Sequence, residues 1–214
     1  MAAPGPSLVQ VRHGPVIVVQ DAYRLIPWAD VLYGCEPRWW RYHDGAFKGE
    51  KWSTHDGSKH SSNDKTEAHE KWNVHCVKGA HGSTFSLDPS VINYGSNSGF
   101  QAINLAILFG CEHIILIGFD MQKTGGRSHF FGEYPRELES GTRYTEFVKH
   151  FDVAAKKLPA HIRIVNATAA SALQCFPKMS LEQALEEQHE LHHTIDTGLA
   201  DTGRISIEGQ VQGA

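Results

Sequence analysis

The residues best suited to chemistry lie between Tyr94 and Met121. The polar turn Gly95-Ser96-Asn97-Ser98-Gly99 leads directly into an apolar segment. A turn of this kind at the start of a helix presents backbone N–H groups and hydroxyls at the positive end of the helix dipole, which suits a phosphate group. The same residues also fit an ordinary glycine-rich turn in which Asn97 or Ser98 caps the helix. The spacing is neither G-x-x-x-x-G-K-[ST] nor G-x-G-x-x-G, which disfavours Walker ATPases and the common dinucleotide dehydrogenases.

Carboxylates follow or precede the β-branched runs of the sequence. Asp120 comes soon after the run Ile114–Ile117, Asp21 comes shortly after the run Val16–Val19, and Asp30 precedes a third apolar run. A carboxylate after a buried strand can bind Mg²⁺ or a ribose hydroxyl, and it can equally cap the next turn. If the strands are neighbours, we expect these carboxylates to share one edge with Asp120, where hydrated Mg²⁺ and substrate phosphates would be held.

Histidines and cysteines give one further candidate. His129, in Ser128-His129-Phe130-Phe131-Gly132, is expected to overhang the same edge as Asp120. It is a candidate general acid/base or phosphate ligand, or a histidine hydrogen-bonded beneath a loop. The histidines between His43 and His81 match no zinc-binding pattern and are interpreted as solvated. The cysteines form no C-x-x-C pair, which is typical of reduced thiols in a cytosolic protein.

Strands and helices are expected to alternate along the chain, which predicts an α/β domain with a mostly parallel sheet. In such a sheet, helix N-termini and strand carboxyl ends lie at the same edge, where ligands bind. Strands are expected at residues 16–19, 31–35, 73–77, 114–117 and 162–165. Helices are expected at residues 100–109, 144–158 and 171–176, and after Ser180. Residues 44–64 and 78–93 show no periodicity and are expected to be irregular.

Size and charge limit the functional classes. The chain has 214 residues, 41% of them hydrophobic, which suits one domain over residues 1–188 followed by a disordered polar tail over 189–214. The formal net charge is −4 without any basic run, so nucleic-acid binding has no electrostatic support. No apolar run reaches the length of a membrane span, and the first residues lack the features of a signal peptide. We therefore expect a cytoplasmic protein with a small-molecule partner.

Several of these motifs together resemble a group of Rossmann-like transferases. The resemblance is carried by Gly5-Pro6-Ser7-Leu8, Val16–Asp21, Asn97-Ser98-Gly99 with its apolar helix, and Gly118-Phe119-Asp120. It extends over roughly residues 5 to 188, and the loops match poorly. The group includes archaeal 6-hydroxymethylpterin diphosphokinases of the MptE type, CMP-sialic-acid sialyltransferases, and many phage and prophage proteins. It implies a Rossmann-like three-layer sandwich.

The resemblance also implies a function and a set of site residues. It implies a nucleotide-binding transferase that moves a diphosphate or a nucleotide-activated group, with an ATP- or CMP-type nucleotide as substrate and Mg²⁺ as cofactor. Asp120 would bind the metal and act in catalysis together with His129. The expected nucleotide-binding residues are Gly5, Pro6, Ser7, Asp21, Gly95, Ser96, Asn97, Ser98 and Gly99.

The sequence departs from the family pattern at three places. Ala3 stands at the first glycine position of the G-x-G-P-S turn and no strand precedes it, so the expected fold lacks its first strand. Gln122 replaces the tyrosine of the sialyltransferases, and no G-H-S histidine follows, which argues against sialyl transfer. Gln20-Asp21 replaces a frequent asparagine. The alternatives are a non-catalytic nucleotide- or sugar-binding module and a phage assembly factor on the same fold.

Overall fold

The computed structural model describes residues 14–55, 70–129, 131, 133–138, 141 and 143–201. The predicted phosphate-binding residues Gly5, Pro6 and Ser7, and any strand before them, lie outside the described residues. Every residue of the predicted turn before the apolar helix is described, as are Asp21, Asp120 and His129.

The described strands form two sheets in which every pairing is parallel. The larger sheet has five strands in the order β1-β2-β3-β4-β5, so each strand lies beside its neighbour in the chain. Its strands are β1 (Ile17–Val19), β2 (Val31–Tyr33), β3 (Glu50–His55), β4 (Val74–Ala80) and β5 (Val91–Asn93). The smaller sheet pairs β6 (His113–Leu116) with β7 (Arg163–Asn166). This arrangement, flanked by helices, confirms the predicted Rossmann-like α/β sandwich.

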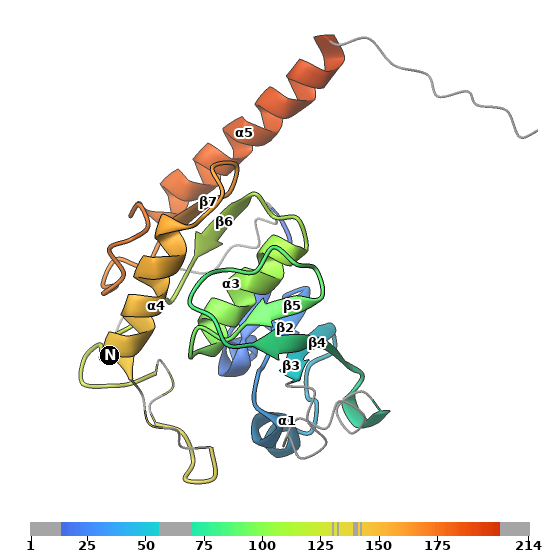
Figure 1. Ribbon diagram of the computed structural model, residues 1–214, viewed down its shortest axis with the longest axis vertical. Coiled ribbons are helices and arrows are strands. Elements are labelled where there is room, and N and C mark those ends of the chain that lie inside the picture. The colour runs from blue at the N-terminus through green and yellow to red at the C-terminus, as the bar shows by residue number, and fades with distance from the viewer. Residues whose placement is uncertain are drawn as a thin grey trace, which may run out of the picture.

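Helices cover the sheets and join them. They are η1 (Gln20–Arg24), α1 (Pro37–His43), α3 (Ser98–Leu108), α4 (Tyr144–Lys156) and α5 (Leu181–Asp201). Figure 1 shows α3 over the larger sheet, α4 on the side of β6 and β7, and α5 running away from the rest of the molecule. No helix within the described segments combines the length and the apolar character needed to cross a membrane.

Helix α3 is the central element of the core. Its residues Ala102 and Leu105 pack with the larger sheet. Its residues Phe100, Ile103 and Ile107 pack with β6, β7 and α4. The apolar side chains on two sides of one helix therefore hold the two sheets together, as expected for a helix that is hydrophobic around most of its circumference. The position of the turn before α3 is fixed by this packing.

The opposite side of the larger sheet is closed by tryptophans. Trp39 and Trp40 on α1 are each 1% exposed and pack with Val18 and Leu32. Their rings meet edge to face with centroids 5.1 Å apart. Because a buried aromatic side chain removes a large apolar area from water, the pair stabilises this layer strongly. Helix α1 thus covers this face of the larger sheet.

Two strands lie in segments that were predicted to be irregular. β3 falls within residues 44–64 and β5 within residues 78–93, so these two predictions were wrong. β3 was missed because its buried residues are polar: Ser53 and Thr54 are each 2% exposed between β2 and β4. A strand that is paired on both sides does not need the alternating apolar pattern by which strands are recognised.

The C-terminal segment also differs from prediction. The expected helix at residues 171–176 does not form, and α5 continues to Asp201, well past the predicted start of a disordered tail at residue 189. A reciprocal cap begins α5: Gln183 N–H donates to Ser180 Oγ at 3.2 Å, and Ser180 N–H donates to Gln183 Oε1 at 3.0 Å. Beyond the cap, Leu, Glu, Gln and Ala favour a helix although the segment is polar. Residues 202–214 lie outside the described residues.

Candidate functional site

Most of the described candidate residues lie at one edge of the sheets, here called the carboxyl edge. It consists of the residues that follow β1, β2, β5, β6 and β7, together with the first turn of α3. The predicted turn Gly95–Gly99 follows β5 closely and opens α3. Asp21 follows β1 and Asp120 follows β6. The parallel topology thus places the turn and both carboxylates on one side of the sheets, as predicted.

Asn97 caps α3 and shapes the turn. Its backbone is extended (φ −155°, ψ 155°), and its Oδ1 accepts a hydrogen bond from Phe100 N–H at 2.8 Å. The capping interpretation of the turn is therefore correct. Helix geometry leaves the N–H groups of Ser98 and Gly99 without acceptors inside the helix. The cap and these N–H groups therefore belong to the same turn.

Side chains from three other elements surround this turn. Ser98 Oγ lies 3.0 Å from Cys35 Sγ, just after β2. Ser96 Oγ donates to Glu146 Oε1 of α4 at 3.1 Å. A Cβ on Gly99 would lie 2.9 Å from Cε1 of Phe119, so only glycine lets that ring approach the first turn. Each of these residues is partly exposed, so the turn is flanked by the protein and not enclosed by it.

Cys35 is a site residue that the sequence analysis did not select. Burial raises the pKa of its thiol to about 11, so it is protonated at neutral pH and is unsuited to act as a nucleophile. It can instead hydrogen-bond to Ser98. Its position after the apolar run Val31–Tyr33 was a usable signal, because residues after parallel strands gather at the carboxyl edge.

Asp120 is tied to its own turn. Its Oδ1 accepts from Thr124 Oγ1 at 3.2 Å, and its carbonyl accepts from Ala172 N–H at 2.7 Å. The neighbouring Phe119 is the residue that contacts Gly99, which brings Asp120 close to the start of α3 along the chain. Among the residues that the structure describes, no three His, Cys, Asp or Glu side chains gather as a metal site. Mg²⁺ at Asp120 would therefore take its remaining oxygen ligands from water or from a bound phosphate.

The other two carboxylates have different surroundings. Asp21 is 3% exposed, and its Oδ2 accepts from Trp39 Nε1–H at 2.8 Å while Arg24 Nε lies 3.4 Å from Oδ1. It anchors α1 to the end of β1. Asp30 accepts from Val16 N–H at 2.8 Å and precedes β2. The expectation that Asp30 shares an edge with Asp120 was wrong, because a residue before a parallel strand lies at the opposite edge.

His43 is buried, contrary to the interpretation of this region as solvated. It is 9% exposed and stacks on Trp39 with centroids 4.2 Å apart. Its Nδ1 is hydrogen-bonded to Tyr23 OH at 3.1 Å, and its Nε2 lies 3.7 Å from Asp21 Oδ1. Burial lowers its pKa and the nearby Asp21 carboxylate opposes that shift. The position of His43 in the last turn of α1, four residues after Trp39, was the available signal.

His129 lies in an aromatic cluster on the segment that follows β6. Its ring is parallel to that of Phe131 (4°, centroids 5.1 Å apart) and meets Tyr134 at 63° and 4.7 Å. Burial lowers its pKa, and Glu133 and Asp21 are the acidic groups that oppose the shift. The predicted partner Asp120 is not one of those two groups. His129 is thus electrostatically linked to the end of β1.

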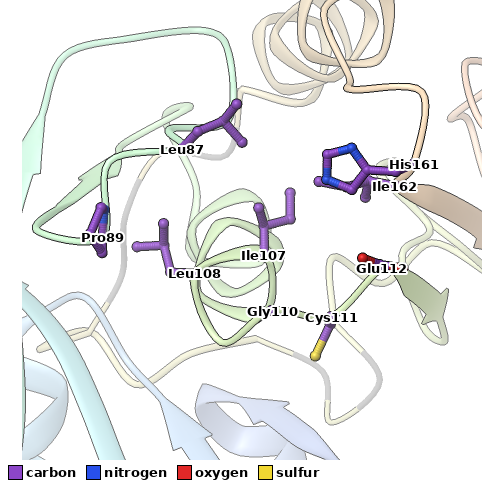
Figure 2. A pocket seen from close by; sticks show the side chains of 9 residues that line it. All are labelled: Leu87, Pro89, Ile107, Leu108, Gly110, Cys111, Glu112, His161 and Ile162. Atoms are coloured by element: carbon purple, nitrogen blue, oxygen red, sulfur yellow. The ribbon is translucent and has the colours of Figure 1, made fainter. Parts of the chain in front are cut away.

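A half-open hollow lies at the opposite end of α3, away from every predicted site residue (Figure 2). Its volume is about 170 Å³. It is lined by residues around the C-terminus of α3 and before β6 and β7, namely Leu87, Pro89, Ile107, Leu108, Gly110, Cys111, Glu112, His161 and Ile162. In Figure 2 the sulfur of Cys111 points away from the ring of His161, so the two do not form a nucleophile–base pair.

The carboxyl edge therefore combines the features expected of a site for an anionic ligand. Two N–H groups at the start of a buried helix, the Ser98 hydroxyl and the Asp120 carboxylate lie on one side of the sheets. Aromatic rings lie on the segment that follows Asp120. A comparison of the chain with models of known families, with curated proteins and with solved structures finds no match in any of the three.

Proposed function

We propose that this chain is a nucleotide-binding transferase that holds the phosphates of an ATP- or CMP-type nucleotide at the carboxyl edge. The observation that carries the proposal is the first turn of α3. It is capped by Asn97, it presents the Ser98 and Gly99 N–H groups, and it lies on the same edge as the carboxylate that follows β6. Such a helix start is a favourable place for a phosphate group.

Each residue of the site has a role that its surroundings support. Asn97 fixes the turn, while Ser98 contributes its hydroxyl and N–H to the phosphate. Asp120 holds Mg²⁺ together with phosphate oxygens, and His129 supplies a proton or a phosphate contact. Transfer of a diphosphate or of a nucleotide-activated group then depends on positioning and on neutralising charge, as phosphoryl transfer generally does.

One observation favours the alternative of a binding module without catalysis. The buried Asp21 is occupied by Trp39 and Arg24, and the described residues contain no preformed cluster of metal ligands. A protein that only binds a nucleotide needs the helix start and no second carboxylate. Binding without turnover would select this alternative.

Thermal unfolding of the full chain with ATP, CTP or CMP, with and without MgCl₂, tests the proposal. At least one nucleotide should raise the melting temperature, because a ligand that binds only the folded state stabilises it. Asn97→Ala should abolish the increase, whereas Asn97→Ser, which keeps a capping oxygen, should retain much of it. If no nucleotide changes the melting temperature, the site is not a nucleotide site.

Turnover separates the transferase from the binding module. Phosphorus NMR of the chain with ATP and MgCl₂, in the presence of candidate acceptors with hydroxyl groups, should show new phosphate resonances that Asp120→Asn removes. A nucleotide that binds and is recovered unchanged in every case would support the module.

A further inference from the structure

Three aromatic rings gather on a short segment that the proposed roles only partly use. The rings of His129 and Phe131 are parallel with centroids 5.1 Å apart, and Tyr134 meets Phe131 at 67° and 4.9 Å. All three side chains are half-buried, so each retains some surface in contact with solvent. The remaining exposed surface of these rings is available to contact a flat ligand.

This cluster is fixed to the carboxyl edge. Tyr134 OH donates to Gln20 Oε1 at 3.1 Å, at the end of β1. Burial, followed by the charge of Asp21, raises the pKa of Tyr134 well above its usual range, so the phenol stays neutral. Leu138, 3% exposed, packs in the tryptophan layer and anchors the same segment a second time. The rings are therefore held in place and do not move freely with a loop.

The cluster also adjoins the start of α3. Tyr134 contacts Gln20 at the end of β1, and β1 pairs with β2 so that Val19 lies opposite Tyr33. Cys35 follows β2 closely, and its Sγ lies 3.0 Å from Ser98 Oγ. On the other side, Tyr144 OH donates to the carbonyl of Ser128 at 2.8 Å, which ties the residue before His129 to the first turn of α4. The aromatic rings thus stand beside the turn to which we assign the phosphates.

We propose that His129, Phe131 and Tyr134 form an aromatic wall against which the base of the nucleotide stacks. This inference rests on the proposed nucleotide site and extends it from the phosphates to the base. Stacking on aromatic rings contributes to the binding of any base, because every base has a π-face. The site should therefore accept more than one nucleotide base and should discriminate strongly against phosphate compounds without an aromatic ring.

Isothermal titration of the full chain with CTP and with sodium tripolyphosphate tests the wall. Phe131→Leu should raise the Kd for CTP about tenfold, since loss of one stacking partner commonly has an effect of this size. It should leave the Kd for tripolyphosphate unchanged, because that compound has no base. Phe109→Leu is the matched control: Phe109 is 44% exposed at the other end of α3, and its loss should alter neither value.

A second pair of variants covers the case in which Phe131→Leu does not fold. His129→Ala should weaken CTP binding, and His129→Phe, which keeps a flat ring, should restore it. If Phe131→Leu and His129→Ala leave CTP binding unchanged, or weaken CTP and tripolyphosphate equally, the wall does not contact the base. If the wild-type chain binds neither compound, the nucleotide site is absent, and the proposal of an aromatic wall for the base is excluded as well.

Discussion

The two ends of α3 differ in the chemistry that they offer. At its N-terminus, the helix has a polar cap, a hydroxyl near a thiol and a hydrogen bond to α4 through Ser96. At its C-terminus, Gly110 (φ +84°) and Cys111 adjoin a half-open hollow of about 170 Å³ that is also lined by Glu112 and His161. The hollow offers neither a helix N-terminus nor a capping side chain.

This difference shows why the helix start is the better candidate for a nucleotide. The C-terminal end of a helix carries partial negative charge on its carbonyls, which disfavours a phosphate there. The N-terminal end carries partial positive charge and presents N–H groups.

The largest expected difference between the two ends concerns their glycines. A Cβ on Gly95 (φ +50°) would lie 2.1 Å from ring atoms of the fully buried Phe100, whereas a Cβ on Gly110 would meet nothing within 4 Å. Gly95→Ala should lower the free energy of unfolding by about 3 kcal/mol, from overpacking and backbone strain. Gly110→Ala should cost about 1 kcal/mol, from the backbone alone. Urea unfolding measures both, and equal losses would show that Phe100 does not constrain the turn.

The next effect compares carboxylates at the two edges of the sheet. Asp21→Ala leaves the buried indole N–H of Trp39 without its acceptor and should cost about 2–3 kcal/mol. Asp30→Ala, at the opposite edge, removes an acceptor for the exposed N–H of Val16 and should cost about 1 kcal/mol or less. Chemical unfolding of both variants provides the comparison. A larger loss for Asp30→Ala would mean that Asp21 is not the anchor of α1.

A smaller effect is expected from pH. Burial lowers the pKa of His43 and of His129 below the ordinary value of about 6.5. Between the folded and unfolded pKa values the unfolded chain binds more protons, so stability rises with pH through this range and falls on acidification below about pH 6.5. Melting curves recorded between about pH 5 and 8 cover the range in which histidines ordinarily titrate. In this range, His43→Gln should reduce the dependence of stability on pH.

The matched control for the pH prediction is the exposed His161 at the hollow. His161→Gln, which removes a histidine from the surface, should leave the dependence of stability on pH unchanged. A pH dependence of stability that is reduced in His161→Gln and unchanged in His43→Gln would show that His43 is not the acid-sensitive group.

The smallest effect is expected at the hollow. Leu87 is 60% exposed at its rim, so Leu87→Ala should change the free energy of unfolding by no more than about 0.5 kcal/mol. It should also leave any nucleotide-induced increase in melting temperature intact. A nucleotide response that Leu87→Ala removes would relocate the ligand to the hollow.

The fold was predictable where local patterns decide it. β-Branched runs marked β1 and β6, an apolar run marked β2, and the apolar segment after Asn97 marked α3. β3 could not be found in this way, because its polar residues Ser53 and Thr54 are buried by neighbouring strands. The start of helix α5 after Ser180 was predicted, but its continuation to Asp201 was not, because a polar composition resembles a disordered tail even when its residues favour a helix.

The candidate site was predictable only in part, for a related reason. The cap at Asn97 depends on residues three positions apart and could be read from the sequence. The contact of Ser98 with Cys35 joins residues 63 positions apart and depends on which strands are neighbours. His43 looked solvated because its burial depends on Trp39 and on the distant Asp21. Asp30 was assigned to the wrong edge because a residue before a strand was treated like one after it.

Amide hydrogen exchange of the full chain with and without saturating CTP tests the central claim most directly, because it reads both ends of α3 in one experiment. Binding at the carboxyl edge should slow exchange in residues 95–101 and in the segment around Asp120, and leave residues 107–112 and 161–162 unchanged. Protection confined to the hollow at the C-terminus of α3, or no protection anywhere, would contradict the assignment of the nucleotide to the helix start.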